Sequence, residues 1–156
     1  MGVEIERKFL VSGDAWRRHA GAGQTLRQGY LSTDAEATVR VRTDGLVGWI
    51  TIKGRTDGIR RAEFEYAIAA RDADELMTMC GERVVAKIRY RIRIPQSPHV
   101  WEIDEFGGSN AGLITAEIEL SAADEHFHRP EWLGPEVSHD PRYANSNLAL
   151  RPFQSW

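Results

Sequence analysis

This sequence lacks the features that stabilise small secreted domains or place a chain in a membrane. Its 156 residues include one cysteine, Cys80, so an internal disulfide and a thiolate metal cluster are excluded. No segment approaches the roughly 20 apolar residues that a membrane helix needs. The first residues also lack the basic segment and apolar run of a secretion signal. We therefore expect a cytoplasmic protein with no membrane segment.

An excess of charge of one sign is also absent. The net charge is −3, although 28% of the residues are charged. Such a balance argues against a general surface for duplex nucleic acid or another polyanion, so any basic site must be local. No low-complexity segment, linker or long repeat divides the chain. We expect residues 1–156 to form a single domain, because a chain of this length buries roughly two-thirds of its unfolded surface.

What recurs along the chain is an alternation of one charged residue with one β-branched or aromatic residue. This period of two is typical of a β-strand with two unlike faces. It predicts strands at 3–11, 38–43, 49–53, 61–68, 87–94, 100–106 and 115–120, and more weakly at 26–33. Turn sequences at 44–45, 57–58, 95–98 and 107–110 separate several of these strands. Tight turns join antiparallel neighbours, so most of the chain is expected to form a meander that closes, or nearly closes, on itself.

Helical patterns are fewer than strand patterns. They occur at 14–20, at 72–80 and at 121–128, where Ser121 and Asp124 resemble a capping box. A last short helix is expected to begin near Asn145 or Ser146. The sequence thus predicts a mainly β fold of the α+β class, with the few helices packed outside the strands.

The charged residues of the predicted strands form rows of like sign. A single strand of this kind is most simply explained by a polar face that meets water. Seven strands with the same pattern are hard to explain in that way, because a solvent face is usually diluted with Thr, Ser and Gln. The carboxylates of the rows are Glu4, Glu6, Glu63, Glu65, Glu102, Asp104, Glu117 and Glu119, and the cations are Lys8, Arg40, Arg42, Lys53, Arg61, Lys87, Arg89, Arg91 and Arg93.

Like charges two residues apart on one strand face repel each other, and a bound group of opposite sign would relieve that repulsion. Paired carboxylates suit a hard divalent cation, whereas rows of Arg and Lys suit phosphate, which Arg binds through two hydrogen bonds. A metal ion and a polyphosphate together would satisfy both kinds of row. If the barrel closes, we expect the charges to line a water-filled lumen and the apolar face to be covered from outside.

The segment Glu4-Ile5-Glu6-Arg7-Lys8 resembles the ExExK signature of the CYTH superfamily, the triphosphate tunnel metalloenzymes. ExExK alone is a short and weak pattern, but the rows that follow it are in the order of that family. The ending EVSHDPRYANSNLA is also similar to the family's C-terminal segment, so the likeness covers essentially the whole chain. The matching rows are Arg40 with Arg42, Lys53, Glu63 with Glu65, Lys87 with Arg89 and Arg91, and Glu117 with Glu119.

This resemblance implies an eight-stranded antiparallel closed β-barrel tunnel that binds a linear triphosphate and one or two divalent ions, Mg²⁺ or Mn²⁺. Members of the family include inorganic, thiamine and RNA triphosphatases and class IV adenylate cyclases. This chain most resembles the inorganic and thiamine triphosphatase branch. The expected activity is metal-dependent hydrolysis of a small-molecule triphosphate, with inorganic tripolyphosphate as the first candidate. A homodimer is a possible assembly.

Roles follow for the residues that match the family. Cations would bind the phosphate oxygens and offset the charge that develops as the terminal phosphoryl group is transferred; these are Lys8, Arg40, Arg42, Lys53, Lys87, Arg89 and Arg91. Glu4, Glu6, Glu117 and Glu119 would hold the metal, with Glu63, Glu65 and Asp104 as direct or water-mediated helpers. Arg61 and Arg93 are expected at the rim.

Tyr30 is a separate candidate. It shares the inward face of its strand with Gln28, and beside Lys53 it would orient the attacking water. A tyrosine that only packs in the wall explains the same pattern. With Lys8 and Lys53, Tyr30 completes the set of predicted catalytic residues.

Two alternatives remain at this stage. One is a module that binds polyphosphate without hydrolysing it, which the paired carboxylates disfavour because a pure anion binder has no use for them. The other is another activity on the same fold, such as a thiamine or nucleoside triphosphatase or an adenylate cyclase, but no adenine pocket is visible in the sequence. No GxSxG or Cys-His arrangement indicates a nucleophile, so we expect no covalent intermediate.

Overall fold

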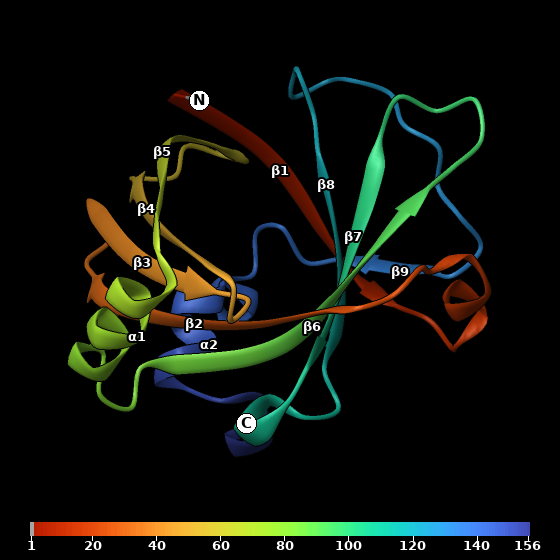
Figure 1. The fold of residues 1–156 in the computed structure, drawn as a ribbon. Helices are drawn as coiled ribbons and strands as arrows, with labels where there is room; N and C mark the ends of the chain where they lie inside the picture. The colour runs from red at the N-terminus through yellow and green to blue at the C-terminus, as the bar shows by residue number, and fades with distance from the viewer. Residues whose placement is uncertain (1) are drawn as a thin grey trace.

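The computed structural model describes residues 2–156, in which nine antiparallel strands form one sheet that curls until its ends meet (Figure 1). Eight strands follow the order β5-β4-β3-β2-β6-β7-β8-β1, and a β5–β1 pairing closes the ring. The predicted eight-stranded antiparallel barrel is confirmed, and β9 is an additional strand. In chain order the strands are β1 (Gly2–Val11), β2 (Gln24–Thr33), β3 (Ala37–Thr43), β4 (Val47–Gly54), β5 (Arg60–Ala69), β6 (Val84–Arg93), β7 (Val100–Phe106), β8 (Ile114–Glu119) and β9 (Leu133–Glu136).

Strand β1 closes the barrel because its two halves pair with different strands. Along one edge, the segment from Gly2 to Ile5 pairs with β5, and further along the same edge β9 lies opposite Phe9 and Val11. On the other edge, the segment from Glu6 to Leu10 pairs with β8. The ExExK segment therefore lies at the seam of the barrel, next to two strands that are distant in the sequence.

The helices agree with the sequence only in part. Helix α1 (Ala70–Met79) and helix α2 (Asn145–Leu150) confirm two predictions, and 14–20 contains a short 3₁₀ helix at Ala15–His19. Further 3₁₀ turns lie at Gly108–Asn110, Pro141–Tyr143 and Phe153–Ser155. No helix in residues 2–156 combines the length and apolar character needed to cross a membrane.

The predicted helix at 121–128 is wrong. Ser121 begins a turn in which its backbone N–H donates to the Glu125 carboxylate, and residues 125–130 belong to neither a helix nor a strand. The carboxylate that binds Ser121 is therefore that of Glu125, four residues on, and not that of Asp124 in the predicted capping box. Phe127, which the helix would have carried, instead packs against Phe9 and Trp101 on the outer face of the sheet.

The apolar side chains lie on the outside of the barrel, as predicted. Over β1, β6, β7 and β8, Trp16 and Trp132 cover a cluster that includes Phe9, Ile92 and Trp101. Helix α1 lies close to the sheet over β2, β3 and β4 (Figure 1). Two strand glycines leave room for it. A Cβ on Gly29 would lie 2.6 Å from Cys80 Sγ, and a Cβ on Gly48 would lie 2.5 Å from Ala73 Cβ. These two clusters thus surround the strands from outside, and most of the inward face is left for polar side chains.

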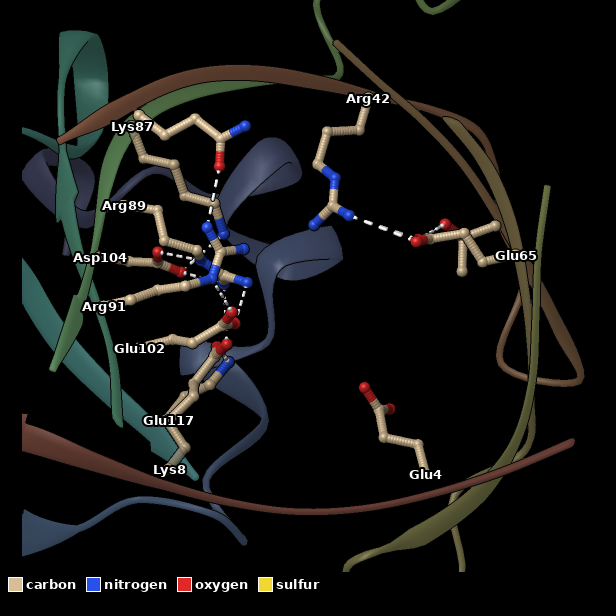
Figure 2. A network of polar contacts seen from close by, with 12 residues as sticks. Glu4, Lys8, Arg42, Glu65, Lys87, Arg89, Arg91, Glu102, Asp104 and Glu117 are labelled. Atoms are coloured by element: carbon tan, nitrogen blue, oxygen red, sulfur yellow. Dashed lines mark hydrogen bonds and ion pairs between the residues drawn. The ribbon is translucent and has the colours of Figure 1, made fainter. Parts of the chain in front are cut away.

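Helix α2 differs from the predicted outside helices. Its Leu148 is fully buried against Val85, Phe106 and Leu113, and Val85 and Phe106 continue the inward rows of Lys87 on β6 and Asp104 on β7. Figure 2 shows this helix behind the charged side chains, across the barrel. An apolar cluster therefore closes part of the lumen at this end.

Candidate active site

The charged rows of the sequence converge on a cavity of about 610 Å³ inside the barrel. Figure 2 shows Arg42 and Glu65 on one wall and Arg89, Glu102 and Glu117 on the opposite one. The predicted inward orientation is therefore confirmed for these rows. The charged lining residues are Glu4, Glu6, Arg40, Arg42, Lys53, Glu63, Glu65, Arg89, Arg91, Glu102, Glu117, Glu119 and Glu125.

A second cavity, of about 490 Å³, shares Glu4 and Glu6 with the first. It contains Lys8 and Arg61 and is bounded by the segment 137–147. The Lys8 ammonium donates to the Tyr143 carbonyl at 3.1 Å, so this C-terminal segment is anchored directly to a predicted catalytic residue. Lys8 thus lies in the second cavity, next to the segment 137–147 that precedes and enters α2.

On the wall formed by β6, β7 and β8, Arg89 is the centre of an ion-pair network. Its guanidinium donates twice to Asp104, at 2.7 Å each, and to Glu117 at 2.9 Å, and it also pairs with Glu102 (Figure 2). Lys87 Nζ lies 2.6 Å from the second Asp104 oxygen, and neither side chain of that pair is exposed. Lys87 and Asp104 were predicted as ligands, yet neither lines the two cavities. Asp104 binds Arg89 directly, and Lys87 binds Asp104, so this buried pair fixes the Arg89 guanidinium from the side away from the cavity.

On the opposite wall the cations are shared among three carboxylates. Lys53 Nζ lies 3.0 Å from Glu4 and 2.8 Å from Glu63. Arg40 and Arg42 both approach Glu65, at 3.2 and 3.4 Å. Every predicted phosphate-binding cation in residues 2–156 therefore has a carboxylate partner, and in the cavities an anionic ligand would compete with those carboxylates.

Glu6 and Glu119 are directly opposite each other across the β1–β8 ladder. Neither carboxylate has a cation partner among residues 2–156. Burial and the charges of Glu117 and Glu4 raise the pKa of Glu6 to about 8. Burial, followed by Glu4, Glu63 and Glu102, raises the pKa of Glu119. A cation bound between these strands would remove that repulsion.

Glu4 shows the opposite behaviour. Burial favours its neutral form, but the charges of Lys53 and Arg61 outweigh that effect and lower the pKa of Glu4 to about 2. Arg61 donates to Glu4 at 2.6 Å and lines the second cavity, so it is more than the rim charge that the sequence suggested. Arg93 is exposed and lines neither cavity, in line with a rim position.

Tyr30 lies on the inward face but not where it was predicted. Its hydroxyl accepts a hydrogen bond from Gln28 at 2.9 Å, and its register partner on β3 is Arg40. Lys53 is opposite Thr38 and Glu63 instead. Tyr30 is fully buried and lines neither cavity, so a contact with an attacking water through Lys53 is not part of this arrangement.

Two residues of the site, Glu102 and Thr51, have no predicted role. Glu102, although recognised as a row carboxylate, binds both Arg89 and Arg91 and lines the cavity. Thr51 is fully buried between Arg40 and Glu65, and it contacts both. Its place on the inward face of 49–53 is visible in the sequence, but its side chain is uncharged and so does not belong to a row of like charges.

The carboxylates of the cavity have the right donor atoms for a divalent metal, but they are not arranged around one common point. They offer the oxygen donors that Mg²⁺ and Mn²⁺ prefer, and Glu6 and Glu119 have no competing cation. Within residues 2–156, however, no three acidic, His or Cys side chains are close enough together to hold one ion. Glu4, Glu63, Glu65 and Glu117 are each bound to a lysine or arginine.

An antiparallel barrel with its apolar core mostly outside and an array of cations and carboxylates inside defines a class of proteins: barrels with a charged, polar tunnel. The CYTH domain family model matches residues 2–151, and this chain belongs to that family. The suspected resemblance is therefore confirmed.

Two curated relatives match this chain over almost the full length of both proteins. The chain is 45% identical to an inorganic triphosphatase of Acetivibrio thermocellus, over 100% of this chain and 99% of that protein. It is 36% identical to an inorganic triphosphatase of Nitrosomonas europaea, over 95% and 97%. The crystal structure of the inorganic triphosphatase NE1496 has a TM-score of 0.65 and 35% identity, over 94% of this chain and 97% of that one.

Proposed function

We propose that this protein hydrolyses inorganic tripolyphosphate in a reaction that depends on a divalent metal ion. The observation that carries the proposal is the convergence of cations from β3, β4 and β6 with carboxylates from β1, β5, β7 and β8 on one cavity. Relatives at 45% and 36% identity that carry the name inorganic triphosphatase support the choice of substrate.

The cations would bind the phosphate chain and stabilise charge as it develops on the transferred phosphoryl group. Arg40, Arg42, Lys53, Arg89 and Arg91 line the main cavity, whereas Lys8 reaches the phosphate from the second one. Arg89 is held by Asp104 and Glu117 in a fixed orientation, as a preorganised donor requires. Lys87 would act through Asp104, by keeping that carboxylate charged and in place.

Glu4, Glu6, Glu117 and Glu119 would hold the metal, with Glu63 and Glu65 as helpers; Asp104 is a weaker candidate because its oxygens are bound to Lys87 and Arg89. Mg²⁺ or Mn²⁺, when bound, neutralises phosphate charge and activates water for in-line attack. Tyr30 is a candidate for positioning Arg40, its neighbour in register, rather than for direct contact with water.

The experiment is to measure release of phosphate from tripolyphosphate, thiamine triphosphate and ATP, each with Mg²⁺, with Mn²⁺ and with a chelator. We expect the highest kcat/KM with tripolyphosphate and loss of activity in chelator. Turnover that persists in chelator would overturn the metal dependence. Binding of tripolyphosphate without phosphate release under any of these conditions would replace the hydrolase by a binding module.

Nothing in the cavity favours a nucleotide. Among residues 2–156, its lining contains no Phe, Tyr or Trp on which a base could stack. We therefore rank adenylate cyclase activity below hydrolysis, and cyclic AMP formation from ATP in the same assay would reverse that ranking.

A further inference from the structure

Thr51 occupies the centre of a row of inward side chains that crosses four strands. Tyr30 on β2, Arg40 on β3, Thr51 on β4 and Glu65 on β5 are successive partners in the register of the sheet. The Thr51 side chain is fully buried, and it lines neither cavity. It therefore acts on a ligand, if at all, through Arg40 or Glu65.

The hydroxyl of Thr51 contacts both charged neighbours. It donates to Glu65 Oε2 at 2.7 Å and accepts from the Arg40 guanidinium at 3.0 Å, which uses its one proton and one of its lone pairs. Arg40 and Glu65 also touch each other directly, at 3.2 Å. The three groups form a triangle in which the hydroxyl is the one neutral member.

We propose that Thr51 is a positioning residue: its hydroxyl holds Glu65 by a hydrogen bond that does not depend on Arg40, so that Arg40 can turn to a phosphate oxygen of the substrate. The proposal rests on the proposed function, because it concerns how the same site binds a triphosphate. It assigns a role in substrate binding to a residue that contacts no substrate.

The charges around Glu65 give the reason. Arg40 and Arg42 both converge on its carboxylate, and the only other donor to it among the described residues is Thr51. When triphosphate draws both guanidinium groups away, the Thr51 bond still satisfies one carboxylate oxygen. Without that bond Glu65 would retain the two arginines more tightly, since a partly buried carboxylate that loses its partners is destabilised. The arginines would then bind triphosphate more weakly.

The chain provides a matched control. Thr115 on β8 is also fully buried and on the inward face, opposite Asp104 in register. Its hydroxyl, however, has no hydrogen-bond partner in the described part of the chain. Thr→Val replaces the hydroxyl by a methyl group of similar size at either position, so the two variants differ in whether a bond to a charged pair is lost.

The experiment compares Thr51→Val, Thr51→Ser and Thr115→Val for kcat and KM with tripolyphosphate, and for the melting temperature. For Thr51→Val we expect KM to rise about tenfold, equivalent to ~1.4 kcal/mol, with kcat changed less than about threefold. Thr51→Ser should restore KM, and Thr115→Val should leave it unchanged. An unchanged KM in Thr51→Val, an equal rise in Thr115→Val, or failure of Thr51→Ser to restore KM would each overturn the proposal.

Calorimetric titration with tripolyphosphate in the presence of chelator separates this proposal from the proposed function. If the wild type binds tripolyphosphate in this titration but releases no phosphate from it with Mg²⁺ or Mn²⁺, the hydrolase assignment fails. Weaker binding by Thr51→Val than by Thr115→Val would still support the role of Thr51. Equal affinities of the two variants would refute that role even in an active enzyme.

Discussion

Glu6 and Glu119 face each other across the β1–β8 ladder, with no cation partner for either among residues 2–156. Their neighbours on the same faces, Glu4 and Glu117, are both bound to cations. Burial and the charges of Glu117 and Glu4 raise the pKa of Glu6, and burial with the charges of Glu4, Glu63 and Glu102 raises the pKa of Glu119. The protein without metal therefore carries a local electrostatic cost at the position where carboxylates from two walls meet.

Glu6 should make the stability of the metal-free protein depend on pH. Its pKa is raised from 4.5 to about 8, so the folded state binds the proton more tightly, and the resulting stability is full below pH 4.5 and is lost as the pH rises through 8. In Glu6→Gln we expect the fall in melting temperature between pH 5 and pH 8.5 to become smaller by at least about 5 °C. Thermal unfolding of both proteins in the presence of chelator, at pH 5 and at pH 8.5, measures this difference in melting temperature. Glu131→Gln, at an exposed position, is the control and should follow the wild type; parallel curves for Glu6→Gln and wild type would contradict the raised pKa.

Lys8→Ala and Glu119→Ala should reduce tripolyphosphate hydrolysis by at least roughly a hundredfold, the usual effect of removing one electrostatic stabiliser. Both variants should fold. In Lys8→Ala the Glu117 carboxylate keeps Arg89 as its partner, and in Glu119→Ala no cation among the described residues loses a partner. Steady-state rates with melting temperatures test this. The control is Arg93→Ala, on the same strand as Arg89 and Arg91 but outside both cavities. Near wild-type rates in either variant would remove that residue from the site.

Asp104→Ala should be much more destabilising than Glu102→Ala, two residues away on β7. Asp104 is fully buried, and its loss leaves the buried Lys87 uncompensated, which typically costs about 3–5 kcal/mol. Glu102 pairs with Arg89 and with the exposed Arg91, and its side chain is partly exposed, so we expect less than about 1 kcal/mol. Urea unfolding gives both values. Equal losses would mean that Lys87 and Asp104 do not form the buried support described above.

Gly29→Ala should displace helix α1. The added Cβ would lie 2.6 Å from Cys80 Sγ and 2.8 Å from Met77 Sδ, both buried under the helix. Overpacking of this kind typically costs about 1–3 kcal/mol. Gly21→Ala places the same methyl in open space and should change stability by less than about 0.5 kcal/mol. A neutral Gly29→Ala in urea unfolding would show that α1 does not need this close approach.

Much of the barrel could be predicted because its signal is local. The alternation that defines each strand is carried by the strand's own residues, and the observed ends differ from the predicted ones by at most three residues. Strand β9 (Leu133–Glu136) was missed because four residues with Gly134 and Pro135 show no alternation. The helix at 121–128 was wrongly predicted because Ser121 and Asp124 have the spacing of a capping box, whereas the carboxylate that binds the Ser121 N–H belongs to Glu125 and completes a turn.

The partners inside the barrel could not be predicted in the same way. Which cation meets which carboxylate depends on the stagger between strands, as in the pairing of Glu4 with Arg61, and no strand contains that information alone. Burial along one row also varies with depth: Arg91 is exposed, whereas Lys87 is completely enclosed. The position of α2 depends on Leu148 and Ala149 reaching an apolar cluster, which six residues of sequence do not reveal.

The outer placement of the apolar core separates two kinds of evolutionary change. Side chains such as Phe9, Trp101 and Met77 hold the strands in shape without touching the lumen, and inward residues such as Arg42 and Glu65 can be exchanged without loosening that shell. A barrel filled by its own core has no such freedom, because every inward substitution changes its packing. This architecture should therefore tolerate new ligand chemistries more readily than new strand lengths or helix positions.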